Sequence, residues 1–232
     1  MMPTALITGA SRGLGLEFVR QYAAAGWRVI ACCRSPKKSA GLRAVVGAKK
    51  GTVTIEKLDV NDPTTIRGLS TKYARAAIDV LVNNAGVYGP RDLAYDAIDY
   101  KAWDQVMHTN AMAPLRVAAA FLPQVARSDK KTIATVTSWM GSMGSNESGG
   151  HYIYRSSKAA VNAVMKSLAI DVKGKGVVVA LFHPGWVKTD MGGPNAAIDA
   201  TESVAGMRAV IGKLKKKDTG KFFNYDGKPM PW

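Results

Sequence analysis

The chain has 232 residues, of which 47% are hydrophobic and 21% charged, a composition typical of a folded globular protein and not of a disordered one. Its 32 basic and 17 acidic residues give a net charge of +15, which would suit a nucleic acid, an acidic surface or a polyanionic cofactor. No zinc-finger, basic-zipper or RNA-binding pattern accompanies that charge, and no apolar run is long enough to span a membrane.

The chain begins with a strand–turn–helix pattern. Residues 3–8 are apolar and predict a buried strand, and residues 16–25 are amphipathic and predict a helix. Between them lies a Gly-x-x-x-Gly-x-Gly turn, in which glycine lets the backbone approach a pyrophosphate at the positive end of the helix. The pattern predicts the phosphate-binding start of a dinucleotide fold. A glycine turn without a cofactor is the alternative.

Strands and helices alternate along the rest of the chain. We expect strands at 27–31, 52–58, 78–82, 131–137, 177–182 and 221–225, and helices at 36–48, 63–75, 100–127, 152–173 and 201–214. Pro114 should bend the longest helix, and the Gly- and Ser-rich segment 141–150 should be a mobile loop. The alternation predicts right-handed βαβ units in a Rossmann-type, doubly wound α/β fold with a parallel sheet of about seven strands flanked by helices. No repeat or linker interrupts it, so we expect a single domain over 1–232.

A candidate proton-transfer pair lies in the 152–173 helix. Tyr154 and Lys158 are four residues apart, which places them on one helical face one turn apart. A phenol has a pKa of about 10, and a nearby cation lowers that value. The pair could therefore act as an acid or base. The alternative is a partly exposed helix face, where such spacing arises by chance.

Taken together, five ordered motifs resemble the short-chain dehydrogenase/reductase family. Residues 8–15 match its TGxxxGxG turn, 83–86 match NNAG, and 184–189 match PGxxxT. Asn110, Ser138, Tyr154 and Lys158 match its catalytic Asn, Ser and YxxxK. The ending 220–227, with Pro231 and Trp232, resembles the C-factor branch, which is associated with intercellular signalling as well as reductase activity.

The resemblance implies a mechanism in which hydride passes between a nicotinamide and a carbonyl or alcohol carbon. Tyr154 would give or take the proton of the oxygen, and Lys158 would lower the Tyr154 pKa and bond the nicotinamide ribose. Ser138 would donate a hydrogen bond to the reacting oxygen. Asn110 would hold a water that connects Lys158 to solvent. Ser138 as a strand-end cap and Asn110 as a helix-bend residue are the alternatives.

The resemblance also implies the binding residues. Those for the cofactor are Gly9, Ser11, Arg12, Gly13, Leu14, Gly15, Arg34, Asp59, Val60, Asn83, Ala85, Gly86, Tyr154, Lys158, Pro184, Gly185, Val187 and Thr189. Those for the substrate are Trp139, Met140, Met143, Trp186 and Met191, which are apolar and adaptable and suggest a hydrophobic or aromatic carbonyl compound. Trp139 and Met143 could equally be packing residues.

The end of the second expected strand predicts NADP(H) as the cofactor. An NAD-type fold usually places an acidic residue about 20 positions beyond the glycine turn, where it bonds the ribose 2′-hydroxyl. No carboxylate occurs from Phe18 to Ile55. Arg34 follows the position of that acid, and Arg12 lies in the turn. Two guanidinium groups can grip a 2′-phosphate, and Lys37 and Lys38 add longer-range attraction.

The leading hypothesis is therefore an NADPH-dependent carbonyl reductase acting on a small carbonyl or alcohol substrate. The alternative is a cofactor-binding signalling or regulatory protein of the C-factor type. The three histidines show no metal-ligand spacing, so we expect no metal, and we expect neither nucleic acid nor membrane as a partner. The adjacent Cys32 and Cys33 cannot build a disulfide framework and favour a cytoplasmic protein.

Family members commonly pair through the two long helices, so the resemblance also implies a homo-oligomer. The second of these helices carries Ala159, Ala160, Ala163 and Ala169, small residues that permit close helix approach. The alternative is that these alanines face the sheet of their own chain.

Overall fold

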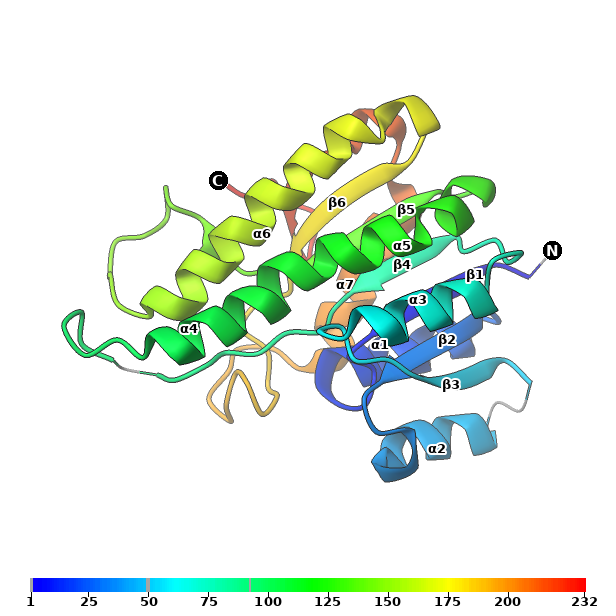
Figure 1. Ribbon diagram of the computed structural model, residues 1–232, viewed down its shortest axis with the longest axis horizontal. Helices are drawn as coiled ribbons and strands as arrows, with labels where there is room; N and C mark the ends of the chain where they lie inside the picture. The colour runs from blue at the N-terminus through cyan, green and yellow to red at the C-terminus, as the bar shows by residue number, and fades with distance from the viewer. Residues whose placement is uncertain (1, 49–50, 92) are drawn as a thin grey trace.

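A computed structural model describes residues 2–48, 51–91 and 93–232. In these residues one parallel sheet lies between two layers of helices (Figure 1). Its strands are β1 (Thr4–Thr8), β2 (Arg28–Cys33), β3 (Val53–Lys57), β4 (Val80–Asn83), β5 (Thr132–Val136), β6 (Val178–His183) and β7 (Lys221–Asn224). Their spatial order is β3-β2-β1-β4-β5-β6-β7, with every neighbouring pair parallel. The predicted doubly wound α/β fold is confirmed.

The helices are α1 (Gly13–Ala24), α2 (Ala40–Ala48), α3 (Pro63–Lys72), α4 (Tyr100–Met107), α5 (Ala113–Arg127), α6 (Tyr152–Asp171) and α7 (Ala200–Lys213). Helices α3, α5 and α6 contribute to the buried cluster on one face of the sheet, and α1, α2 and α7 contribute to the cluster on the other. From β1 the chain builds first toward β3 and then, from β4, toward β7. This reversal opens a crevice at the carboxyl ends of β1 and β4, where ligands of such sheets bind.

The long helix expected at 100–127 is interrupted. Helix α4 ends at Met107, residues His108–Met112 form a π-helical turn, and α5 begins at Ala113. Pro114 explains the break, because proline has no N–H to donate to the carbonyl of Asn110 and its ring clashes with that carbonyl. Such turns are frequent at functional sites. The break places Asn110 inside the molecule, where it is 1% exposed.

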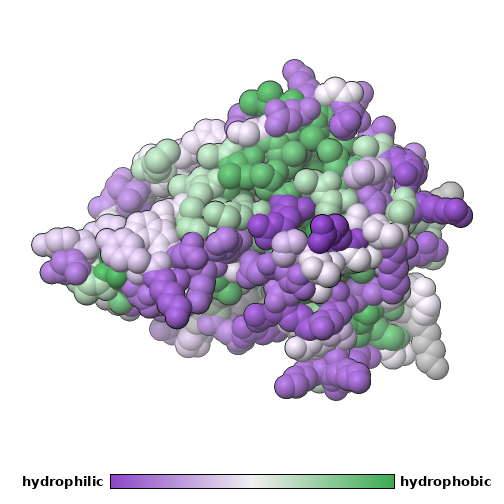
Figure 2. Space-filling view, viewed as in Figure 1, coloured by the Kyte–Doolittle hydropathy of each residue, from purple (hydrophilic) through white to green (hydrophobic). Residues whose placement is uncertain are grey.

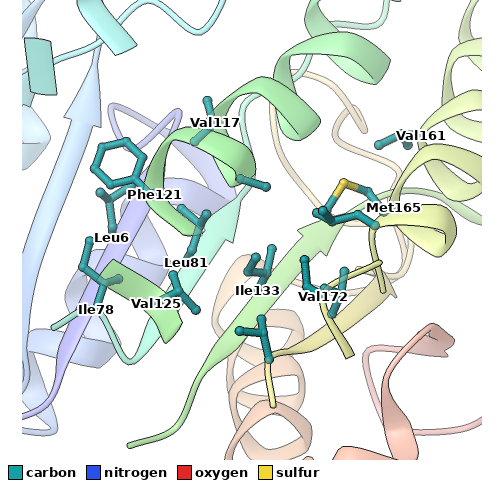
Figure 3. Packing of buried hydrophobic residues seen from close by; sticks show 14 of the residues in the cluster. Leu6, Ile78, Leu81, Val117, Phe121, Val125, Ile133, Val161, Met165 and Val172 are labelled. Carbon is teal, nitrogen blue, oxygen red and sulfur yellow. The ribbon is translucent and has the colours of Figure 1, made fainter. Parts of the chain in front are cut away.

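The α5–α6 side of the sheet is packed with aliphatic and aromatic side chains (Figure 3). Strands contribute Leu6, Leu81 and Ile133, and the helices contribute Phe121 and Met165. All five are fully buried. Among the described helices, none combines the length and the apolar character that a passage through a lipid bilayer requires.

Truncating Phe121 to Ala should lower the free energy of unfolding by about 3–5 kcal/mol, because it removes a buried ring and leaves a cavity at the centre of this cluster. Urea denaturation followed by circular dichroism measures the change. Tyr95→Ala is the matched control, since Tyr95 is 77% exposed in the loop before α4 and its truncation should change stability by less than about 0.5 kcal/mol. Similar losses in the two variants would contradict this account of the core.

Candidate active site

A cavity of about 280 Å³ lies at the carboxyl ends of the central strands. Most of the predicted cofactor residues line it: Gly9, Ser11, Arg12, Gly13, Leu14, Gly15, Arg34, Asp59, Val60, Ala85, Gly86, Tyr154, Lys158, Pro184 and Thr189. Asn83, Gly185 and Val187 do not line it. Asn83 is turned away, because its side-chain amide donates to the carbonyl of Pro114 at 3.1 Å.

The glycine turn is shaped for close approach of the backbone. Gly9 and Gly13 have φ values of +66° and +53°, a region that side chains disfavour. A Cβ at Gly15 would lie 2.2 Å from the carbonyl oxygen of Gly9. The residue before α1, Arg12, makes no side-chain hydrogen bond to the helix N-terminus. The first N–H groups of α1 therefore remain available to an anion.

Asn84, which sequence reasoning missed as a site residue, ties this turn to the end of β4. Its side-chain amide donates to the carbonyls of Thr8 at 2.9 Å and Gly9 at 3.3 Å. In return, the hydroxyl of Thr8 accepts the backbone N–H groups of Asn84 at 3.0 Å and Ala85 at 3.1 Å. The two loops thus form one rigid floor beneath the cavity.

Tyr154 and Lys158 both line the cavity from α6. They are 7% and 6% exposed, so the alternative of an exposed helix face is wrong. The Lys158 ammonium donates to the carbonyl of Val136 at 3.2 Å and lies 5.6 Å from the centre of the Tyr154 ring. The carbonyl at the end of β5 therefore sets the position of the cation.

Burial dominates the ionisation of the pair. It raises the pKa of the Tyr154 phenol above its ordinary value, a rise that hydrogen bonding with Ser138 opposes. It lowers the pKa of Lys158 to about 8. The predicted lowering of the Tyr154 pKa by Lys158 is not seen in this structure: the net change is a rise, and the groups that oppose it are Ser138 and Arg91.

Ser138 lies at the end of β5, where its hydroxyl accepts the N–H of Met140 at 3.1 Å. It thus caps the short 3-10 turn Trp139–Gly141, not the strand as the alternative held, and it opposes the rise of the Tyr154 pKa. Asn110 is held by three bonds: its amide oxygen accepts the N–H of Val87 at 2.9 Å, and its NH₂ donates to Val87 O at 2.8 Å and Ser157 Oγ at 3.0 Å. Its side chain therefore braces the loop after β4.

Two residues that sequence reasoning missed cover Tyr154. The Tyr88 ring stacks on the Tyr154 ring with centroids 4.2 Å apart and an interplanar angle of 11°. Arg91 is exposed in the same loop, and its guanidinium lies 4.2 Å from the centre of the Tyr88 ring. Both lie in an irregular loop after β4 whose sequence carries no periodic signal, so only the fold reveals them.

The predicted substrate residues are not all brought together. Met191 lines the cavity, and its sulfur lies 3.9 Å from the Tyr154 hydroxyl, whereas the sulfur of Met140 lies 3.6 Å from the Tyr88 hydroxyl. Trp139, Met143 and Trp186 do not line the cavity and are 40%, 76% and 56% exposed. Of the five predicted substrate residues, Met191 alone lines the cavity, and the substrate roles of the other four stay predictions.

Arg34 lines the cavity from an exposed position just after β2, and the carboxylate of Asp59, which also lines it, accepts the N–H of Asn61 at 3.0 Å. Arg12 forms an ion pair with Asp190, and both side chains are 75% exposed. Exposed pairs contribute only about 0–1 kcal/mol, so Arg12 can exchange this partner for another anion. In the described part of the chain, no three His, Cys, Asp or Glu side chains are grouped to hold a metal ion.

A sequence model described as short chain dehydrogenase matches residues 3–199. The chain belongs to the short-chain dehydrogenase family. The C-signal protein of Myxococcus xanthus is 44% identical over 167 residues, which are 72% of this chain and 100% of that protein. The predicted family and its C-factor-like character are confirmed by these matches.

Solved structures give the same result. The carbonyl reductase Sniffer of D. melanogaster superimposes with a TM-score of 0.93 at 31% identity and covers 100% of both chains. An NADPH-bound carbonyl reductase from chicken fatty liver superimposes with a TM-score of 0.92 at 32% identity and covers 100% of this chain and 99% of its own. Family and fold together make the chain an NAD(P)-dependent oxidoreductase.

Proposed function

We propose that the chain is an NADPH-dependent carbonyl reductase in which Tyr154 is the acid that protonates the substrate oxygen. The observation that carries this proposal is the buried Tyr154, which lines the dinucleotide cavity together with Lys158. The carbonyl reductases among the similar structures support it.

The residues present fit a dinucleotide. The turn at Gly9, Gly13 and Gly15 leaves no Cβ between the backbone and a pyrophosphate, and the uncapped start of α1 offers N–H donors to it. When bound, NADPH supplies the hydride. Thr189 and the Val187 backbone would hold its carboxamide, Asp59 and Val60 its adenine, and Arg34 with Arg12 its 2′-phosphate. Release of Arg12 from Asp190 would accompany that last contact.

The protein residues then transfer the proton and stabilise the developing negative charge. Ser138 donates to the reacting oxygen, and Tyr154 gives its proton to that oxygen. Lys158, whose pKa is lowered to about 8, is poised to pass a replacement proton near neutral pH. The carbonyl of Asn110 receives no N–H from Pro114 and can hold a water that feeds Lys158.

The second candidate function is signalling or regulation, which the 44% identity to C-signal favours. A panel of aldehydes, ketones and quinones, assayed by NADPH consumption, separates the two candidates. Reduction of at least one hydrophobic or aromatic member supports the reductase, since Met191 and the Tyr88 ring form an apolar wall beside Tyr154. Tight NADPH binding without activity on any member would favour the second candidate.

We also propose that the chain forms a homodimer through α5 and α6. Apolar surface spreads over these two helices (Figure 2), and Met112, Leu115 and Ile170 are 44%, 38% and 65% exposed there. Ala163 is exposed on the same side, whereas Ala169 is 1% exposed and packs in the core of its own chain. The expectation that Ala169 contributes to pairing is therefore not retained.

Light scattering at micromolar concentration should give twice the chain mass of 24.7 kDa. Ala163→Glu should halve that mass, because it puts a charge where two helices would meet. Ala94→Glu adds the same charge at an exposed loop site and should leave the dimer intact. A monomer in the unmodified protein would reject the pairing while leaving the reductase proposal standing.

A further inference from the structure

A second cavity lies at the amino ends of β5, β6 and β7, whereas the dinucleotide cavity lies at the carboxyl ends of the strands. Its volume is about 470 Å³, and the segments that lead into β5, β6 and β7 form it. Five lysines line it, namely Lys130, Lys131, Lys175, Lys215 and Lys216. Hydrophilic surface covers this end of the molecule, where α5 and α6 end (Figures 1 and 2). The proposed reduction makes no use of this group of positive charges, which we call the lysine pocket.

Among the described residues, the ammonium groups of the lysine pocket have no ion-pair or hydrogen-bond partner. One carboxylate, Asp129, lines the same cavity. The nearby Asp218 is engaged elsewhere, with the Lys221 ammonium at 2.8 Å and the Lys215 backbone N–H at 3.0 Å. The pocket therefore holds a positive charge that its own residues do not balance.

Two of the lysines converge on a glycine. A Cβ at Gly176 would lie 3.9 Å from the ammonium nitrogen of Lys216 and 4.0 Å from Cδ of Lys131. Gly176 has a φ of +70°, a left-handed backbone conformation that favours glycine. The two side chains come from different loops, and like charges that lie near each other repel. An anion bound between them would remove that repulsion.

The backbone conformation of Lys131 sets the direction of its side chain. Its φ is +49°, a value that is uncommon for a residue other than glycine. Two hydrogen bonds hold it there: its N–H donates to Ser128 Oγ at 3.1 Å, and its carbonyl accepts the N–H of Val178 at 2.8 Å. The strained conformation persists because β6 and the end of α5 fix it, and strain of this kind concentrates at functional sites.

We propose that the lysine pocket binds a soluble anion that carries two or more phosphate groups. Lysine is a common phosphate ligand, and the volume lies in the range of small-molecule sites. No aromatic side chain among the described residues lines the pocket, so nothing there stacks a nucleic-acid base. Its apolar lining residues, Val178 and Leu214, are buried or half-buried, so neither can enter a bilayer.

Calorimetric titration with inorganic tripolyphosphate tests this proposal. The protein is first saturated with NADPH, so that the dinucleotide cavity does not compete for phosphate, and the salt concentration is close to physiological. One tripolyphosphate should bind per chain. The double variant Lys131→Asn, Lys216→Gln should bind it at least about tenfold more weakly, through loss of two charge-assisted contacts. Asn tolerates the left-handed backbone of position 131, so the fold should be kept.

The matched control is Lys57→Gln with Lys101→Gln, which removes the same charge from exposed sites outside the pocket and should weaken binding by less than about twofold. Equal weakening in the two double variants would show a general charge effect and overturn the proposal, as would the absence of saturable binding. Binding to phosphatidylserine vesicles or to a DNA duplex that excess tripolyphosphate does not displace would assign the surface to a macromolecule and would equally overturn it.

Discussion

Tyr154→Phe should lower kcat for carbonyl reduction by at least about 10²–10⁴-fold, the usual contribution of a general acid. The ring and its stacking on Tyr88 survive the change, and only the hydroxyl beside Ser138 and Met191 is lost. The Kd for NADPH should therefore stay nearly the same. Steady-state kinetics with the best substrate of the carbonyl panel, together with a fluorescence titration of NADPH, measures both quantities.

Tyr152→Phe is the matched control for this experiment. Tyr152 is the first residue of the same helix but is 42% exposed, and the loss of its hydroxyl should leave kcat within about twofold of the unmodified protein. Near-native turnover in Tyr154→Phe would remove Tyr154 from the mechanism. A large loss of NADPH affinity in that variant would instead assign the hydroxyl to cofactor binding.

Arg34→Asp should reverse the cofactor preference. Arg34 lines the cavity just after β2, and in the described part of the chain β2 carries no carboxylate that would accept a ribose hydroxyl. Losing the charge-assisted bonds to a 2′-phosphate should weaken NADPH binding by roughly 10–100-fold. NADH binding should improve, because the new carboxylate repels a phosphate but accepts the 2′-hydroxyl. Titration of both cofactors into both proteins gives the ratio.

Lys38→Asp makes the same change of charge four residues away on an exposed turn. It should weaken NADPH binding only slightly, and salt should reduce the difference, because its effect acts through space. Equal losses in the two variants would show that general charge, not contact with Arg34, selects the cofactor. Tighter binding of NADH than NADPH to the unmodified protein would refute the preference itself.

The interrupted helix shows where sequence reasoning was sufficient and where it was not. Pro114 predicts a bend in one long helix, because a proline inside an α-helix removes a hydrogen bond. The form of the break, a π-helical turn that buries Asn110 against Val87 and Ser157, follows from contacts with a loop and with α6. Periodicity along one segment contains no information about such contacts.

The ionisation of Tyr154 and Lys158 could not be predicted in the same way. The spacing of Tyr154 and Lys158 correctly places both on one face of α6. It does not reveal how deeply the face is buried, and burial decides the sign of the pKa change. Because desolvation disfavours the charged form of each group, the pKa of Tyr154 rises and that of Lys158 falls.

The sequence by itself determined the alternation of strands and helices, the glycine turn before α1 and the positions of Tyr154 and Lys158, because these depend on spacing within one segment. Only the tertiary structure decided which side chains meet. Asn84 bonds Thr8 across 76 positions of the chain, and Asn83 turns to Pro114 instead of the cavity. Such contacts form when distant segments pack around a shared core, and packing selects partners by shape and by hydrogen-bond geometry that no local pattern encodes.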